Sequence, residues 1–378
     1  MQSTQTTTPD VIVIGGGLHG CSAALHLAMR GAAVTVIEQD YVARHASGVN
    51  AGGVRRLGRD VAEIPLSVAS LELWYRIQDL VDDDCGFEHH GQVKVAENAA
   101  ELDILRRRAA ELRALGYDHE EIIDRAELRA LVPAIAEHCV GGIVSRADGA
   151  ANPYRTTMAF KRKAESLGVR FMEGERVIRL GRAGRRWGVE TASGGRWEAA
   201  CVVNCAGAWA DRIAAQLGEP VPLEVWALML MISAPMPHFL DPVIGAVGRP
   251  LSFKQYANGT VLIGGGHKGR ARRDANWTDL DIAGLARSAR TVSDLFPVMR
   301  PAQIVRGWAG IEGRLPDDIP VIGPSSTEAG VFHAFAFAGH GFQLGPVVGG
   351  ILAELVTTGQ SNLPITPFRI DRFGKPGQ

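Results

Sequence analysis

The chain has 378 residues, of which 46% are hydrophobic and 21% are charged, and its formal net charge is −1. These values suit two globular domains, or one domain with a large insertion, and they exclude a disordered or fibrous chain. The near-zero charge gives no electrostatic reason to expect binding to nucleic acid or to an anionic membrane.

The N-terminal segment and the cysteines bear on location. Residues 1–10 read MQSTQTTTPD, without a charge before Asp10, so we expect no signal peptide. No apolar run approaches the ~20 residues that a membrane-spanning helix needs. The five cysteines form no CxxC pair, which favours free thiols in a reducing compartment over a disulfide framework. We therefore expect a cytoplasmic protein without a membrane span.

The first predicted elements form a βαβ unit. The apolar run at 11–14 is typical of a strand that is buried on both faces. Residues 18–30 have the pattern of a helix, which Gly31 ends. Residues 33–37 then predict a second buried strand.

A glycine motif connects the first strand to the helix. Gly15, Gly17 and Gly20 have GxGxxG spacing. In such a motif the first glycine allows a tight turn, the second lets a pyrophosphate approach the backbone, and the third lets helix and strand pack closely. Glu38 ends the second strand, where an acid can accept both ribose hydroxyls of an adenosine and disfavours the 2′-phosphate of NADP. The unit predicts a dinucleotide site without separating FAD from NAD.

Three later segments extend this pattern. Residues 44–56 (RHASGVNAGGVRR) follow the second strand, while 201–211 (CVVNCAGAWAD) and 331–356 each predict a strand, a turn and a helix. They lie far apart in the chain, so we expect one sheet built from discontinuous pieces. An NAD-binding Rossmann domain is normally continuous, and the discontinuity therefore favours FAD.

Other segments predict a second domain and its connection. Residues 98–116 carry one apolar stripe among charges, which predicts a surface helix. The segments VWALMLMISAP (225–235) and GTVLIGGG (259–266) resemble strands. Gly or Pro occupies seven of the nineteen positions of 306–324 (RGWAGIEGRLPDDIPVIGP), so we expect neither a helix nor a long strand there. We expect instead a turn-rich return to the dinucleotide domain.

Taken together, these motifs resemble the D-amino-acid oxidase superfamily of FAD-dependent oxidoreductases, particularly its glycine oxidase and sarcosine oxidase branch. The GxGxxG unit, VNCAGAWA, WAGIEG…PDDIPVIG and GHGFQLGP occur in the order typical of that family and span nearly the whole chain. The third motif is most similar to those of the flavin subunits of sarcosine, opine and hydroxyproline dehydrogenases. The resemblance implies an α/β fold with a Rossmann-like FAD-binding domain (1–84, 146–224 and 311–378). It also implies an α+β substrate domain with a mostly antiparallel sheet (85–145 and 225–310).

The resemblance also implies which residues hold FAD. Gly15, Gly17, Gly20 and Glu38 would bind the ADP half, and the backbone of Val177 would contact adenine. The residues implied at the pyrophosphate and the isoalloxazine are Ser47, Gly52, Gly53, Ala206, Gly207, Gly339, His340, Gly341, Phe342 and Gln343. A helix that begins near 343–344 would point its amides at negative charge on the flavin. No Cys or His matches a site of covalent attachment, so we expect non-covalent FAD.

The implied reaction is oxidation of the C–N bond of an amino acid or secondary amine. Hydride passes to flavin N5, and the imine product hydrolyses. Glu312 stands where glycine and D-amino-acid oxidases place a carboxylate-binding Arg, Gln343 where sarcosine oxidase has a Lys, and Leu262 nearest to its oxygen-activating Lys. Glu312 is thus expected either to bind a cationic substrate group, with Arg314 or Arg56 on a carboxylate, or to form a surface ion pair with Arg314.

Further candidates and alternatives remain open at this point. His340 is a candidate to stabilise reduced flavin, and the candidate wall residues are Phe253, Tyr256, His267 and Trp308. One alternative is an FAD-dependent 2-hydroxy-acid dehydrogenase, which would need His340 or His267 as a base. Another is a flavin-bearing subunit of a heteromeric dehydrogenase. The expected partners are a small amine or amino acid, an electron acceptor and, in that last case, further subunits.

Overall fold

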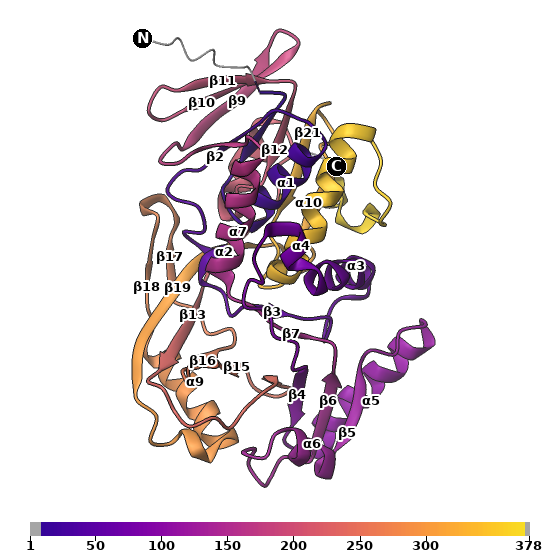
Figure 1. The fold of residues 1–378 in the computed structure, drawn as a ribbon, viewed down its shortest axis with the longest axis vertical. Helices are drawn as coiled ribbons and strands as arrows, with labels where there is room; N and C mark the ends of the chain where they lie inside the picture. Colours follow the sequence, from indigo (N-terminus) through magenta and orange to yellow (C-terminus); the bar gives the residue numbers. More distant parts are fainter. Residues whose placement is uncertain (1–8, 375–378) are drawn as a thin grey trace.

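The computed structural model describes residues 9–374 and contains two large β-sheets, one in the upper and one in the lower half of Figure 1. Residues 1–8, most of the segment examined for a signal peptide, and 375–378 lie outside the described residues. No helix of the described part is long and apolar enough to cross a membrane. The α/β fold expected from the sequence is confirmed by the two sheets and the helices that pack on them.

The upper sheet has six strands, and only its edge strand β20 is antiparallel to its neighbour. In spatial order the strands are β20 (Val321–Pro324), β21 (Val331–Phe335), β12 (Cys201–Asn204), β1 (Val11–Ile14), β2 (Val34–Ile37) and β8 (Arg170–Met172). All four residues of β1 are buried, as expected for a strand that is covered on both faces. The discontinuous strands predicted from three separate segments thus meet in one sheet.

Helices and a small sheet surround the six strands. They are α1 (Leu18–Met29), α3 (Ile64–Tyr75), α7 (Pro153–Ser166) and α10 (Gly341–Thr358), with β9 (Val177–Ala183), β10 (Arg186–Thr191) and β11 (Arg196–Ala199). Helix α10 packs closely on α1, because an added Cβ at Gly345 would lie 2.4 Å from Leu18 Cδ2 and one at Gly349 would lie 2.1 Å from Ser22 Oγ. Helix α10 begins at Gly341, two residues before the predicted start.

The lower sheet has eight strands, all antiparallel except for the β14–β4 pair. In spatial order they are β19 (Ile304–Arg314), β13 (Glu224–Ser233), β16 (Val261–Gly264), β15 (Ser252–Gln255), β14 (Val243–Ala246), β4 (Gln92–Ala96), β6 (Gly141–Ser145) and β5 (Glu121–Asp124). Helices α5 (Ala99–Ala114), α6 (Arg125–Leu131) and α9 (Ile282–Leu295) pack on it. The mostly antiparallel second sheet is therefore confirmed.

Strand β19 corrects one expectation. It runs through residues where we expected no long strand, and that prediction is wrong. Its glycines do not make turns; they permit close approach of neighbours, since an added Cβ at Gly310 would lie 2.2 Å from Val49 Cγ2. The prolines come only after the strand has ended. Because β19 crosses the expected boundary at 310–311, the division into domains stays a prediction.

Short elements connect the two halves. Strand β3 (Gly53–Val54) pairs with β7 (Gly149–Ala150) between the large sheets (Figure 1). The remaining helices and strands are α2 (Ala46–Val49), α4 (Ile77–Val81), α8 (Ala210–Gln216), β17 (Arg270–Arg272) and β18 (Trp277–Asp279). Tryptophan Trp308 of β19 donates from Nε1 to the carbonyl of Val49 at 2.9 Å. These contacts join the lower sheet to the segment that follows β2.

Candidate functional site

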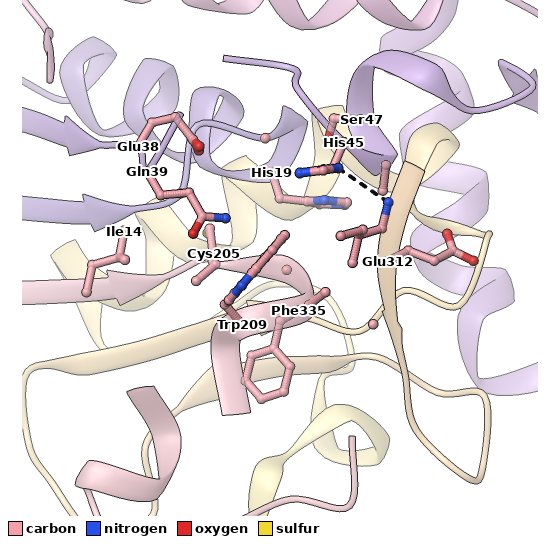
Figure 2. Close-up of a pocket in the computed structure, with 18 of the residues that line it drawn as sticks. Ile14, His19, Glu38, Gln39, His45, Ser47, Cys205, Trp209, Glu312 and Phe335 are labelled. Carbon is pink, nitrogen blue, oxygen red and sulfur yellow. Dashed lines mark hydrogen bonds between the residues drawn. The ribbon is translucent and has the colours of Figure 1, made fainter. Parts of the chain in front are cut away.

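A cavity of about 450 Å³ lies where β1, β2, β12 and β21 end, and we call it the first cavity. Such a position, outside the carboxyl ends of parallel strands, is where open α/β sheets bind ligands. Its lining includes Gly15, Gly17, His19, Glu38, Gln39, His45, Ser47, Asn50, Val177, Ala206, Gly207, Trp209, Glu312, Gly339, Gly341 and Phe342. Figure 2 shows Glu38 and Gln39 at one end and Glu312 at the other.

The glycine motif forms a turn that other residues could not. Gly15 has φ +106°, and an added Cβ there would lie 2.3 Å from the Cys205 carbonyl oxygen. An added Cβ at Gly20 would lie 1.9 Å from the Gly15 carbonyl oxygen. At Gly17 it would lie 2.9 Å from Ser47 Oγ, which accepts a hydrogen bond from the Leu18 amide at 2.8 Å. Gly15 and Gly17 also line the first cavity, so the backbone at the start of α1 faces the space that a dinucleotide pyrophosphate would need.

Glu38, which the sequence predicts to bind the ribose of the adenosine, lies at one end of the first cavity. Its Oε2 accepts from the Gly16 amide at 2.6 Å and its Oε1 from the Asp40 amide at 2.9 Å. Burial raises the pKa of Glu38, and the two backbone hydrogen bonds oppose that rise. Each carboxylate oxygen keeps a lone pair for a ribose hydroxyl. Val177, the residue expected at adenine, lines the same cavity.

His19 lines the middle of the first cavity, between Glu38 and Glu312 (Figure 2). Its ring stacks on Phe337 with centroids 3.6 Å apart. Burial lowers its pKa to about 3, against a hydrogen bond to the backbone of Gly341. The ring is thus neutral, and its Nε2 has no hydrogen-bond partner among residues 9–374. A buried unpaired acceptor here fits a hydroxyl-bearing chain such as the ribityl group of FAD.

His45 connects the segment after β2 to β19. Its Nδ1 accepts from the Ile311 amide at 3.4 Å (Figure 2), and its Nε2 bonds the side chain of Asn276. Burial lowers the pKa of His45, which favours the neutral ring. Sequence reasoning missed both His19 and His45. The sequence did contain a signal for both: His19 lies inside the glycine motif, and His45 lies two positions before Ser47.

Glu312 lies on β19 and lines the first cavity; Figure 2 shows its carboxylate on the side of β19 away from His19. In the described part of the chain its Oε1 has no hydrogen-bond partner, and burial raises the pKa of Glu312 to about 7. Arg314 takes other partners: its Nε bonds Asp318, and its guanidinium lies 4.3 Å from the ring centroid of Trp226. The surface ion pair between Glu312 and Arg314 is therefore not formed. Arg314 itself does not line the cavity.

The loop before α10 turns backbone toward the first cavity and two side chains away from it. Gly339, Gly341 and Phe342 line the cavity, whereas His340 and Gln343 do not. Gln343 is fully buried, and its Nε2 donates to the Ser67 carbonyl at 2.8 Å. The loop is thus held from behind by α3, with its glycines facing the ligand space.

A buried charged pair supports this loop. Arg59 and Glu63 expose no more than 1% of their side chains, and their Nη1 and Oε1 atoms lie 3.4 Å apart. His340 Nδ1 lies 3.5 Å from Glu63 Oε2, and burial lowers the pKa of His340. Burial also pushes the pKa of Glu63 up, but His340 and Arg59 outweigh it and leave that pKa lowered. Sequence reasoning missed this pair, because charges at i and i+4 usually mark a solvated surface.

Arg56 and the two glycines Gly52 and Gly53 do not line the first cavity. The amides of Arg56 and Leu57 both donate to Asp148 Oδ2 at 2.8 Å. Arg56 Nε lies 3.7 Å from Asp148 Oδ1, so this guanidinium already faces an acid. No group of three metal-ligating side chains occurs in residues 9–374.

The four candidate wall residues lie in different parts of the structure. Trp308 bonds Val49 at the junction of the sheets, and Phe253 is fully buried in the core of the lower sheet. The carbonyl of His267 accepts from the Met229 amide at 3.0 Å. Tyr256 lines a second cavity, described below. None of the four lines the first cavity.

Sequence comparison connects these features to known proteins. The profile of the DAO family, described as FAD dependent oxidoreductase, matches residues 10–355. Hydrogen cyanide synthase subunit HcnC of Pseudomonas aeruginosa is 25% identical, covering 97% of this chain and 96% of that protein. Sarcosine oxidase subunit beta of Rhizobium meliloti is 26% identical, with 96% and 88% covered. Glycine oxidase of Geobacillus kaustophilus is 26% identical, with 97% and 98% covered.

Solved structures agree with the fold. L-proline dehydrogenase from P. horikoshii superimposes with a TM-score of 0.89 at 26% identity, covering 97% of this chain and 98% of the other. Glycine oxidase from Geobacillus kaustophilus gives a TM-score of 0.89 at 23% identity, covering 97% and 99%. The two-sheet architecture is therefore shared along almost the whole chain.

Proposed function

The chain belongs to the family of FAD-dependent oxidoreductases, and we propose that it oxidises the C–N bond of an amino acid or secondary amine. Its relatives include proteins named for glycine and for sarcosine, which are both small amines. Bound FAD would supply the hydride acceptor. The protein's part is then to bind, orient and shield the substrate.

The observation that carries the proposal is the carboxylate of Glu312. Glu312 lines the first cavity, and its buried Oε1 has no hydrogen-bond partner within residues 9–374; an added Cβ at Gly339, another lining residue, would lie 3.9 Å from that oxygen. A buried unpaired carboxylate is costly unless a ligand supplies a donor. We infer that the substrate's ammonium group is this donor. Transfer of a proton from the ammonium nitrogen to Oε1 leaves the neutral amine, whose adjacent carbon can give up a hydride.

Other residues fit FAD at the first cavity. The Gly15–Gly20 turn leaves room for a pyrophosphate at the start of α1, and Glu38 accepts ribose hydroxyls at one end. His19 offers an acceptor to the chain between the two ends. The α10 N-terminus, with Gly341 at the cavity, directs its partial positive charge toward the other end.

Anaerobic reduction of the FAD-loaded protein tests the reaction. We expect bleaching of the flavin absorbance with primary or secondary amines and none with 2-hydroxy acids. Bleaching by hydroxy acids alone would reject C–N oxidation. This measurement needs no knowledge of the electron acceptor.

The role of Glu312 has its own test. Glu312→Gln is expected to lower kcat/KM for the best amine by about 100-fold, as loss of a charge-assisted contact predicts. Glu224→Gln is the matched control, because Glu224 lies on the neighbouring strand, outside the first cavity. Unchanged kinetics and unchanged substrate ranking in Glu312→Gln would show that Glu312 does not bind the substrate.

A second candidate is a flavin-bearing subunit that works within a heteromeric dehydrogenase. It is supported by two relatives that carry the word subunit in their names. Size-exclusion chromatography of the purified chain, combined with turnover assays, separates the two. Full amine turnover by the isolated monomer would exclude an obligatory partner.

A further inference from the structure

A second cavity of about 460 Å³ lies where the lower sheet faces β7 and the start of α7. Its walls come from β15, from the β7 segment and from the residues around Gly86 to Gly91. It shares no lining residue with the first cavity. The proposed reaction does not use it.

Lys254 is the unusual residue of this second cavity. It is only 4% exposed, yet within residues 9–374 its ammonium group makes no hydrogen bond and no ion pair. Its Nζ lies 4.6 Å from the ring centroid of Tyr256, and an added Cβ at Gly52 would lie 3.1 Å from that nitrogen. Burial lowers its pKa to about 7, and the charge of Glu88 opposes this shift. A buried ammonium without an ion pair is costly, and that cost is relieved either by loss of its proton or by an anion that binds beside it.

Two further features of the second cavity favour an anion. Tyr256 lines it and makes no hydrogen bond through its hydroxyl in the described part of the chain. Burial raises the Tyr256 pKa to about 12, so the hydroxyl remains a donor. The first turn of α7 also reaches the cavity through Asn152 and Arg155, and a helix N-terminus carries partial positive charge.

The acids at this cavity are exposed or already paired. Glu88 and Asp241 are exposed, and Asp241 Oδ1 lies 2.9 Å from His238 Nε2. Arg155 is paired with Asp83 at 2.7 Å, which leaves Lys254 as the buried cation. His90, the remaining titratable group of the lining, is exposed. The buried part of the cavity is therefore positive and its rim is mixed.

We propose that the second cavity binds the carboxylate of a small organic acid through the ammonium group of Lys254, with the Tyr256 hydroxyl as a second donor. The carboxylate would favour the charged form of Lys254, whose ammonium group has no hydrogen bond or ion pair within residues 9–374. Ammonium and phenol donors at one end of a cavity suit a carboxylate, which accepts at both oxygens.

Strand register limits where this carboxylate comes from. The pairs Glu312–Trp226, Ile232–Leu262 and Leu262–Lys254 place Glu312 and Lys254 on one face of the lower sheet. Six residues of β13 separate the two levels, which is roughly 20 Å of strand. An amino acid whose amine is at Glu312 cannot also place its α-carboxylate at Lys254. The acid is therefore a remote carboxylate of an extended substrate or a separate molecule.

Calorimetric titration of the FAD-loaded protein tests the site, with benzoate and succinate as probes and benzamide as the uncharged control. We expect saturable binding of at least one carboxylate and none of benzamide. Lys254→Met should weaken that binding by at least about 30-fold, since it removes the buried charge. Lys254→Arg should keep part of it. Lys268→Met is the matched control: Lys268 also stacks on an aromatic ring, Trp226 at 3.3 Å, but lies outside the second cavity.

The pH dependence of carboxylate binding gives a second readout. Binding should weaken as the pH rises through the pKa of Lys254, because only the charged ammonium attracts a carboxylate. Equal affinity in Lys254→Met and wild type would overturn the proposal. So would the failure of both carboxylates to bind the wild-type protein.

Kinetics then separate the two sources, and only this arm rests on the proposed amine oxidation. If the carboxylate is part of an extended substrate, the probe should compete with the amine substrate. Lys254→Met should then raise KM only for substrates that carry a remote carboxylate. A probe that binds equally well in the presence of substrate identifies a separate acid. Calorimetry needs no turnover, so failure of the proposed reaction would leave the carboxylate result intact.

Discussion

Arg59 donates from Nη2 to the carbonyl oxygen of His340 at 2.8 Å, across 281 positions of the chain. The same nitrogen lies 3.2 Å from Gln343 Oε1. Through these bonds a charge on the segment before α3 fixes the loop whose glycines line the first cavity. The loop is thus bonded directly to the buried pair behind it.

Removing Arg59 should therefore destabilise the fold. Arg59→Met leaves Glu63 buried without its arginine and with only His340 beside it, and we expect the free energy of unfolding to fall by about 3–5 kcal/mol. Urea denaturation measures this change. Arg106→Met removes an exposed pair with Asp103 and should change it by no more than about 0.5 kcal/mol. Equal effects of the two variants would show that the buried pair contributes nothing special.

The packing role of Gly20 predicts a second result. Gly20→Ala adds a Cβ only 1.9 Å from the Gly15 carbonyl oxygen, so we expect a loss of about 2–3 kcal/mol and weak FAD binding. Alanine is otherwise the better helix former, so destabilisation would identify the clash as its cause. Gly181→Ala on β9 is the control, because nothing lies within 4 Å of the added atom. FAD titration and thermal unfolding report both effects.

His19 predicts a change in FAD affinity. His19→Leu removes the unpaired Nε2 acceptor, and the dissociation constant of FAD should rise by about 5–15-fold. His19→Gln keeps an acceptor and should lose less. Because the pKa of His19 is about 3, the ring stays neutral and the effect should not vary between about pH 6 and pH 9. Fluorescence titration of FAD-free protein measures it; unchanged affinity in His19→Leu would contradict the contact.

Glu312 predicts how stability depends on pH. Its pKa in the folded chain, about 7, lies above the ordinary value of 4.5. Below the ordinary value both states hold the proton; between the two values only the folded state holds it, so stability falls as the pH rises. Glu312→Gln should abolish this loss and make the FAD-free variant more stable than wild type near pH 8, by on the order of 2 kcal/mol, relative to their difference near pH 4. Parallel stability curves would rule out the raised pKa.

The dinucleotide turn could be predicted from sequence because its requirements are local. Gly15 needs positive φ, and Gly20 needs close approach to the same turn, so three glycines and a terminal acid identify the unit. Strand β19 could not be predicted this way. Its glycines serve contacts with Val49, which lies far away in the sequence, and local composition instead indicated turns.

The pairing of charged side chains also could not be predicted from the sequence. Glu312 and Arg314 stand two residues apart, and their pairing was a reasonable hypothesis until Asp318 proved to take the arginine. Arg59 and Glu63 have the spacing of a surface pair, yet both are buried under the loop before α10. Nothing in the sequence singled out Lys254. In each case burial by a distant segment decides the chemistry.

The packing of α10 on α1 sets an order of events during biosynthesis. The glycine turn leaves the ribosome early, but Gly341 and Phe342, which complete the cofactor cavity, follow more than three hundred codons later. At ordinary elongation rates this interval is on the order of tens of seconds. Throughout it, Leu18 and Ser22 lack the glycines of α10 that cover them. The nascent protein must wait with this face open, and FAD can be captured in a complete site only after Gly341 and Phe342 have been synthesised.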